Sequence, residues 1–123
     1  MGHRFEDLSG RVIAAALEVH RQLGPGFLES FYHQAMKVSL AHREIPYQSE
    51  LPVDVDFEGV FIGRARIDLI VGKQIILELK AVDKLHDIHF VQLRSYLRAA
   101  NLRIGLLLNF NAPTLKIRRI IVE

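Results

Sequence analysis

The segment Arg66-Ile-Asp-Leu-Ile-Val-Gly-Lys-Gln-Ile-Ile-Leu-Glu-Leu-Lys80 predicts a β-hairpin that carries charged groups on apolar strands. Asp68, Glu78 and Lys80 interrupt strands that otherwise consist mainly of Ile, Leu and Val. Burying an isolated ion costs far more than a hydrogen bond returns, so such strands rarely carry unpaired charge. Two carboxylates and an ammonium converging on one hairpin therefore predict a metal site with a positioned cation.

Side-chain alternation predicts the register of this hairpin. Each strand carries three alternating apolar residues. The two sets share one face of the sheet only if the connecting loop has an odd number of residues, and the three residues 72–74 satisfy this condition. Val71 is then opposite Ile75, and Asp68 is opposite Glu78 with side chains about 5 Å apart, where two carboxylates repel unless a cation separates them. Core packing and the metal site therefore require the same register. The triplets are Ile67, Leu69 and Val71 on the first strand and Ile75, Leu77 and Leu79 on the second.

Composition favours one domain, residues 1–123, without disulfides or thiolate metal sites, because the chain has no cysteine. The absence of cysteine fits a cytoplasmic protein, and no stretch reaches the roughly 18 apolar residues of a membrane span. Residues 1–10 also lack the hydrophobic region of a signal peptide. The net charge of +2 does not by itself indicate nucleic-acid binding. Two basic groups could follow phosphates or form an ordinary solvated face: Arg94, Arg98 and Arg103, and Lys116, Arg118 and Arg119.

The pattern along the chain predicts an α/β fold with element order ααβββαββ, a mixed central sheet flanked by helices. Residues 51–57 alternate as a strand with one wet face near a sheet edge, and residues 104–108 are apolar throughout, as in a central parallel strand. Helices are expected at 5–22, 27–42 and 86–100, and strands at 51–57, 66–71, 75–80, 104–108 and 115–122.

The hairpin offers oxygen ligands of the hard type that suits Mg²⁺ or Mn²⁺: Asp68, Glu78 and the backbone carbonyl of Leu79. Lys80 lies on the same face as Glu78, where it could orient an attacking water or neutralise charge on phosphorus. The alternative is a salt-bridge ladder on an exposed strand, which the apolar neighbours on that face argue against.

Two helices carry further candidates. On the helix at 86–100, His89, Gln92 and Tyr96 share one face. Gln92 could hold a metal-bound water and Tyr96 could donate to a phosphate, or all three could be structural. In the second helix, Glu29 is expected at the third helical position after a Gly26 N-cap, where it would cap the backbone. Alternatively it reaches the Asp68/Glu78 pair as an outer metal or water ligand, supported by Tyr32.

These motifs together resemble the GxxExxY proteins, a prokaryotic family grouped with the PD-(D/E)XK nuclease superfamily. The signature matches Gly26-x-x-Glu29-x-x-Tyr32. The likeness continues through Gly24-Pro25-Gly26, Arg66-x-Asp68, Glu78-Leu79-Lys80-Ala81-Val82, His89-x-x-Gln92-Leu93-x-x-Tyr96-Leu97 and Gly105-Leu106-Leu107-Leu108-Asn109-Phe110. The resemblance implies a restriction-endonuclease-like core.

By this resemblance the protein is a Mg²⁺-dependent nuclease that hydrolyses DNA phosphodiester bonds with a metal-activated water. Its partner would be DNA, and two-strand cutting would need a homodimer. The alternatives are a non-catalytic module that binds nucleic acid or a partner on the same fold, and an enzyme for another phosphate-bearing substrate. The implied catalytic residues are Lys80, Asp68, Glu78, Gln92 and Glu29, with Asp68 and Glu78 as metal ligands; the implied substrate contacts are Tyr96, Arg66, His89 and Tyr32.

Overall fold

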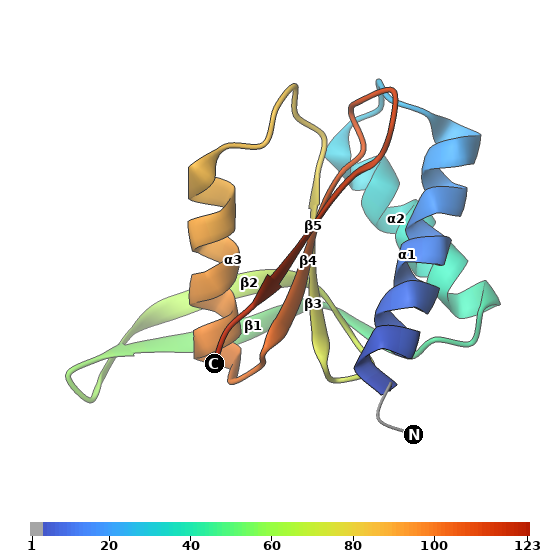
Figure 1. Ribbon diagram of the computed structural model, residues 1–123. Helices are drawn as coiled ribbons and strands as arrows, with labels where there is room; N and C mark the ends of the chain where they lie inside the picture. The colour runs from blue at the N-terminus through green and yellow to red at the C-terminus, as the bar shows by residue number, and fades with distance from the viewer. Residues whose placement is uncertain (1–3) are drawn as a thin grey trace.

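The computed structural model describes residues 4–123, and side chains from residue 8 onward. The observed element order confirms the predicted ααβββαββ pattern (Figure 1). The helices are α1 (Arg4–Leu23), α2 (Glu29–His42) and α3 (Asp87–Ala100). The strands are β1 (Tyr47–Phe57), β2 (Val60–Val71), β3 (Ile75–Lys80), β4 (Ile104–Asn109) and β5 (Lys116–Ile121).

The strands form one mixed sheet in the order β1-β2-β3-β4-β5. Neighbours run antiparallel except β3 and β4, which are parallel and connected through α3. Helices α1 and α2 pack on one face and α3 on the other, so β4 is buried on both sides as expected of a central strand (Figure 1). Within the described residues, no helix is both long and apolar enough to cross a membrane.

Helix α3 approaches the sheet closely over Gly105. A Cβ built on this glycine would lie 3.0 Å from three atoms of the fully buried Leu93 side chain. We expect Gly105→Ala to lower the free energy of unfolding by about 1–3 kcal/mol, because the packed leucine has no room to move. Gly10→Ala is the control: its Cβ meets nothing within 4 Å, and in helix α1 it should stabilise by about 1 kcal/mol. Urea unfolding measures both, and a neutral Gly105→Ala would contradict the close approach.

The hairpin has the predicted register where its strands pair, but the predicted Asp68–Glu78 pair does not form, because the strands separate beyond Leu69 and Leu77. Leu69 pairs with Leu77, and Val71 pairs with Ile75 across the three-residue loop. A second expectation is also wrong: Ile67 packs under α3 and does not share the α1–α2 face with Leu69. The β1–β2 pairing is interrupted between these two positions, at Glu50, whose φ is +52°. Both strands change face at this break: Leu51, which pairs with Ile67, packs under α3, whereas Leu69 packs under α1 and α2.

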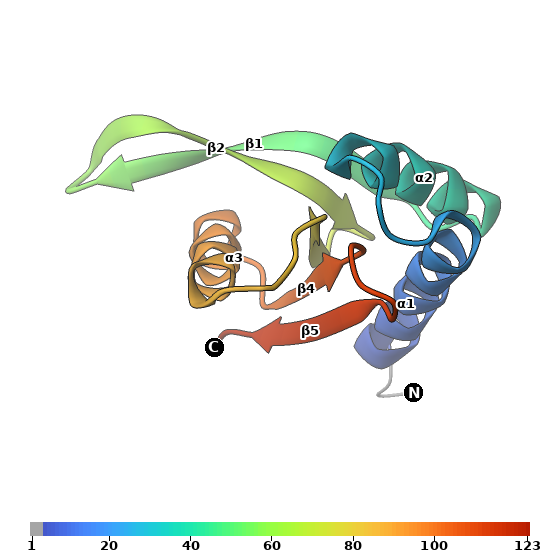
Figure 2. The ribbon, with the colours of Figure 1, turned by 90° about the horizontal axis from the view of Figure 1, so that it is seen from above.

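Strands β1 and β2 also extend further than expected and form a two-stranded ribbon that projects beyond the body of the protein (Figure 2). Leu51, Val53 and Val55 alternate inward as predicted, on a strand at the sheet edge. Phe57 was expected inward but is 63% exposed, because it lies at the end of the ribbon where nothing covers it.

Candidate active site

The candidate site lies where β2 and β3 part. The two strands pair over only three residues of each, ending at Leu69 and Leu77. Beyond that point, the backbone N–H of Leu79 donates to Asp68 Oδ2 at 3.0 Å. A side-chain carboxylate thus accepts the N–H that faces β2. Since the N–H and C=O of a strand residue point to the same neighbour, the Leu79 carbonyl faces this gap too.

Helix α2 brings Glu29 and a histidine to the same gap. His33 Nε2 lies 3.5 Å from Asp68 Oδ2 and 3.8 Å from Glu29 Oε2. One ligand atom from each of these three residues lies within 4.8 Å of the others, which suits a metal ion. His33 was not predicted. Its signal was present, since a residue four positions after Glu29 lies on the same helical face.

The expected capping arrangement of α2 is wrong. The helix begins at Glu29 with Leu28 as N-cap, so Gly26 is outside it and Glu29 is the first helical residue. The pKa of Glu29 is lowered, mainly by its interaction with the His33 imidazole and further by the charge of Lys80. Both partners belong to the gap between β2 and β3, so the carboxylate turns toward the site.

Glu78 carries an uncompensated charge in this gap. Its side chain is 5% exposed, and Oε1 has no hydrogen-bond partner among the described residues. Burial, and then the neighbouring charge of Asp68, raises the pKa of Glu78 to about 7. Burial also raises the pKa of Asp68, against the Leu79 N–H and the His33 charge, which lower it. A buried carboxylate oxygen without a hydrogen-bond partner, together with other hard oxygen donors, fits a divalent cation.

Lys80 is the last residue of β3 and supplies a positive charge to this group. β3 is held there by β4, because Lys80 pairs with Asn109 and the N–H of Phe110 donates to the Lys80 carbonyl at 2.9 Å. The Asn109 side chain also bonds both the N–H and the carbonyl of Val82, at 3.0 and 2.9 Å. The chain on either side of Lys80 is therefore firmly placed.

Helix α3 supplies Tyr96 from the opposite side. Burial, and then the charges of Glu78 and Asp68, raises the pKa of the Tyr96 hydroxyl, which places it near the carboxylates. Gln92 is exposed one turn earlier and lies close enough to Tyr96 to lower the pKa of its hydroxyl. His89 makes a hydrogen bond that caps the start of the helix: its Nδ1 accepts the backbone N–H of His86 at 3.0 Å.

The remaining two predicted substrate contacts lie elsewhere. Tyr32 is fully buried, so its expected contact with substrate is wrong. Its hydroxyl donates to the Gly24 carbonyl at 2.6 Å and accepts the Phe27 N–H at 3.2 Å, and these bonds order the loop that leads to Glu29. Arg66 is exposed on the ribbon and donates to Glu50 at 3.2 Å.

Comparison with known proteins identifies the family of this chain. The sequence model of the PD-(D/E)XK nuclease superfamily matches residues 6–120. The chain belongs to the PD-(D/E)XK nuclease superfamily. Nucleases of this superfamily generally use divalent metals, and their substrates are nucleic acids. The fold of this PD-(D/E)XK chain, a mixed sheet between helices, is the restriction-endonuclease-like one.

A solved structure, the crystal structure of SSO0001, shares this fold with a TM-score of 0.61 and 23% sequence identity. The similarity covers 75% of this PD-(D/E)XK chain and 48% of the other, so the chain spans about half the length of that protein. No curated protein matches the sequence.

Proposed function

We propose that the protein is a metal-dependent nuclease that hydrolyses phosphodiester bonds in DNA, and that it belongs to the GxxExxY group of the superfamily. The observation that carries the proposal is the convergence of Glu29, Asp68, Glu78 and Lys80 where β2 and β3 part. Buried like charges have no structural benefit, and Glu78 Oε1 lacks a partner among the described residues. A divalent cation, together with Lys80, would compensate the three carboxylates.

Asp68, Glu78 and the Leu79 carbonyl would hold Mg²⁺ or Mn²⁺, with Glu29 binding directly or through water. The bound ion would supply a water of lowered pKa and would stabilise charge that develops on phosphorus. Lys80 would orient the attacking water and neutralise charge on the scissile phosphate. Tyr96, with Gln92 beside it, would donate a hydrogen bond to a phosphate oxygen, and His89 and Arg66 would contact the substrate further out.

The test is cleavage of single- and double-stranded DNA and of RNA by the purified protein, with Mg²⁺, with Mn²⁺ and with EDTA. We expect DNA cleavage that either ion supports and EDTA abolishes. Cleavage only of RNA or of nucleotides would contradict the substrate class. Salt-dependent DNA binding without metal-stimulated turnover would contradict the enzymatic proposal and indicate a binding module.

His33 adds an imidazole to this site, and its role has its own test. We expect His33→Ala to weaken Mn²⁺ binding by about tenfold or more, because the residue contacts Asp68 and Glu29. Calorimetric titration with Mn²⁺ measures the affinity directly. His42→Ala is the matched control, since His42 is an exposed residue of the same helix. Unchanged Mn²⁺ affinity in His33→Ala would exclude the histidine from the metal site.

A further inference from the structure

The end of the β1–β2 ribbon exposes a cluster of large apolar side chains, here called the ribbon tip. Phe57, Val60, Phe61 and Ile62 are 63%, 64%, 50% and 63% exposed. The strands are joined there by Glu58 and Gly59, whose φ values are +50° and +80°, as in a tight two-residue hairpin turn. The ribbon carries these side chains beyond the body of the protein (Figure 2). Apolar side chains gathered on a projecting element mark a contact surface.

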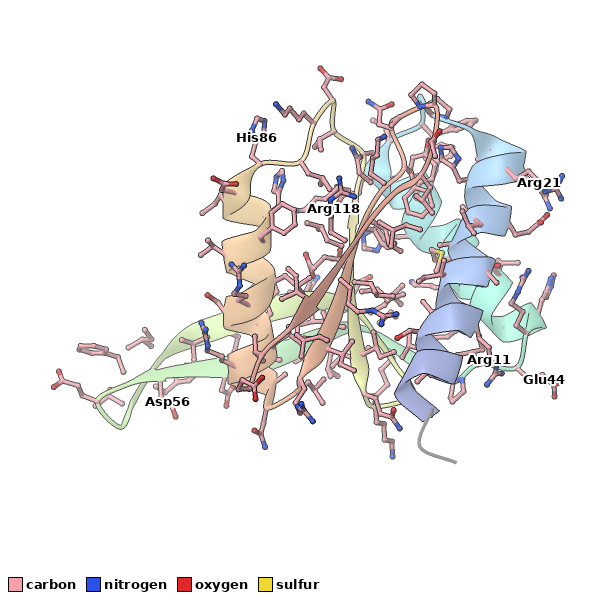
Figure 3. The ribbon with its side chains drawn as sticks, in the orientation of Figure 1. Arg11, Arg21, Glu44, Asp56, His86 and Arg118 are labelled. Atoms are coloured by element: carbon pink, nitrogen blue, oxygen red, sulfur yellow. The ribbon has the colours of Figure 1, made fainter. Side chains whose placement is uncertain are left out.

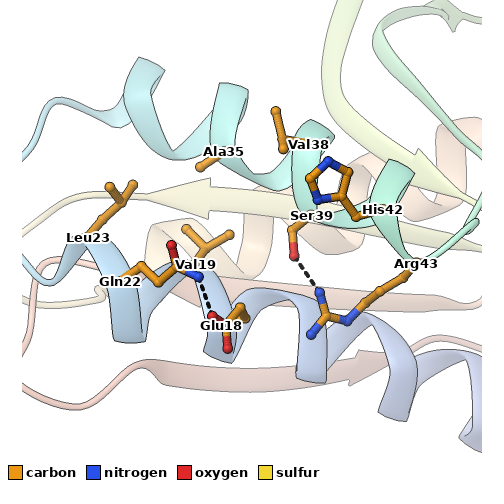
Figure 4. Close-up of a pocket in the computed structure, with 9 residues that line it drawn as sticks. All are labelled: Glu18, Val19, Gln22, Leu23, Ala35, Val38, Ser39, His42 and Arg43. Atoms are coloured by element: carbon orange, nitrogen blue, oxygen red, sulfur yellow. Dashed lines mark hydrogen bonds between the residues drawn. The ribbon is translucent and has the colours of Figure 1, made fainter.

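A groove on the other side of the molecule could receive such a tip. It lies between α1 and α2, on their outer surface, and encloses about 320 Å³ (Figure 4). Its apolar walls are Val19, Leu23, Ala35 and Val38. Val38 is 55% exposed although it faces this groove, so a large part of the wall is uncovered.

The charges around the two surfaces are complementary. Asp56 and Glu58 flank the ribbon tip, where Arg64 is paired with Asp54 at 2.8 Å. His42 and Arg43 border the groove, whose carboxylate Glu18 is paired with Arg21. Arg11 adds a further cation there, because its guanidinium donates to the Arg43 carbonyl at 3.3 Å. The acidic flank also argues against nucleic acid as the occupant of the tip, since phosphates would be repelled.

The tip cannot reach the groove of its own chain. Asp56 lies at one end of the molecule and Arg11, Arg21 and Glu44 lie at the other (Figure 3). We propose that the groove between α1 and α2 binds the ribbon tip of a second copy of this chain, and that two copies do so reciprocally. A two-fold axis between antiparallel copies satisfies both contacts at once, so the assembly closes as a dimer. The dimer carries two candidate active sites, as two-strand cutting requires.

Cysteine cross-linking tests the contact without reference to activity, because the natural chain has no cysteine. Ile62→Cys protein is mixed with Val38→Cys protein under mild oxidation, and the mixed disulfide is identified by mass. We expect this disulfide to form at least about tenfold faster than the one between Ile62→Cys and Ala99→Cys proteins, because docking raises the effective concentration of the two thiols. Ala99 is an exposed control position on α3. Equal rates with Val38→Cys and Ala99→Cys would overturn the proposal.

Sedimentation measures the assembly itself. We expect the wild type at twice the 14.1 kDa of one chain, and both Phe57→Ser/Ile62→Ser and Val38→Glu at one chain's mass. These side chains are exposed, so circular dichroism should remain as in the wild type, and thermal unfolding of the variants should lose only its dependence on protein concentration. A monomeric wild type, or a tip variant that still dimerises, would overturn the proposal. Loss of DNA binding in the tip variant, with no change in mass, would assign the tip to nucleic acid instead and overturn it too.

Discussion

Glu78→Gln is expected to lower metal-stimulated DNA cleavage by on the order of 10³-fold, because a metal ion contributes several kcal/mol to transition-state stabilisation and each ~1.4 kcal/mol is tenfold. The substitution keeps the shape of the side chain and removes its charge, so it tests the carboxylate as a ligand. Asp68→Asn and Lys80→Ala should have comparable effects. Each of these residues belongs to the gap where β2 and β3 separate.

The same substitution should leave the fold intact and even stabilise the metal-free protein. Glu78 is 5% exposed and its Oε1 has no hydrogen-bond partner among the described residues, so its charge opposes folding. Glu50→Gln is the control, since that carboxylate is exposed and accepts a hydrogen bond from Arg66 on the ribbon. We expect Glu50→Gln to cleave as the wild type does. Cleavage that persists in purified Glu78→Gln protein would rule out Glu78 as a metal ligand.

The metal-free protein is expected to lose stability as the pH rises from 4.5 to about 7. Burial, and then the charge of Asp68, raises the pKa of Glu78 from its ordinary 4.5 to about 7 in the folded state. The unfolded chain therefore releases this proton at a lower pH than the folded chain does. One pKa unit corresponds to ~1.4 kcal/mol, so the loss above pH 7 approaches about 3 kcal/mol.

The ionisable groups beside Glu78 also contribute to the pH dependence of stability, and the direction of each pKa shift gives the sign of its contribution. Burial raises the pKa of Asp68, and the nearby Glu29 carboxylate raises the pKa of His33. Both groups therefore stabilise the folded state at low pH and lose that contribution as the pH rises through their folded pKa values. The pKa of Glu29 is lowered, chiefly by its interaction with His33, so its contribution is lost only as the pH falls below 4.5.

Urea unfolding at pH 5 and pH 8 measures this effect. With EDTA we expect lower stability at pH 8, and with Mn²⁺ we expect the difference to shrink, because the cation pairs with the ionised carboxylates. Glu78→Gln should remove most of the pH dependence in EDTA. Equal stability of the metal-free wild type at the two pH values would contradict the uncompensated charge at this site.

Much of the candidate site follows from local pattern. Asp68, Glu78 and Lys80 lie within one hairpin, and the parity of its loop determines which side chains share a face. The predicted pairs Leu69–Leu77 and Val71–Ile75 are those observed. His33 could be identified only from the tertiary structure. Its position one helical turn after Glu29 indicates a role in the site only once α2 is known to pack beside Asp68.

The sequence by itself determined the order of the elements, the hairpin register and the placement of three charges on apolar strands, because alternation and turn chemistry act over a few residues. Only the tertiary structure decided that the β1–β2 pairing breaks at Glu50, that Tyr32 is buried under its loop, and that the ribbon tip is left uncovered. Those outcomes depend on which surfaces meet across long stretches of chain. The periodicity of one segment carries no information about the partner it will pack against.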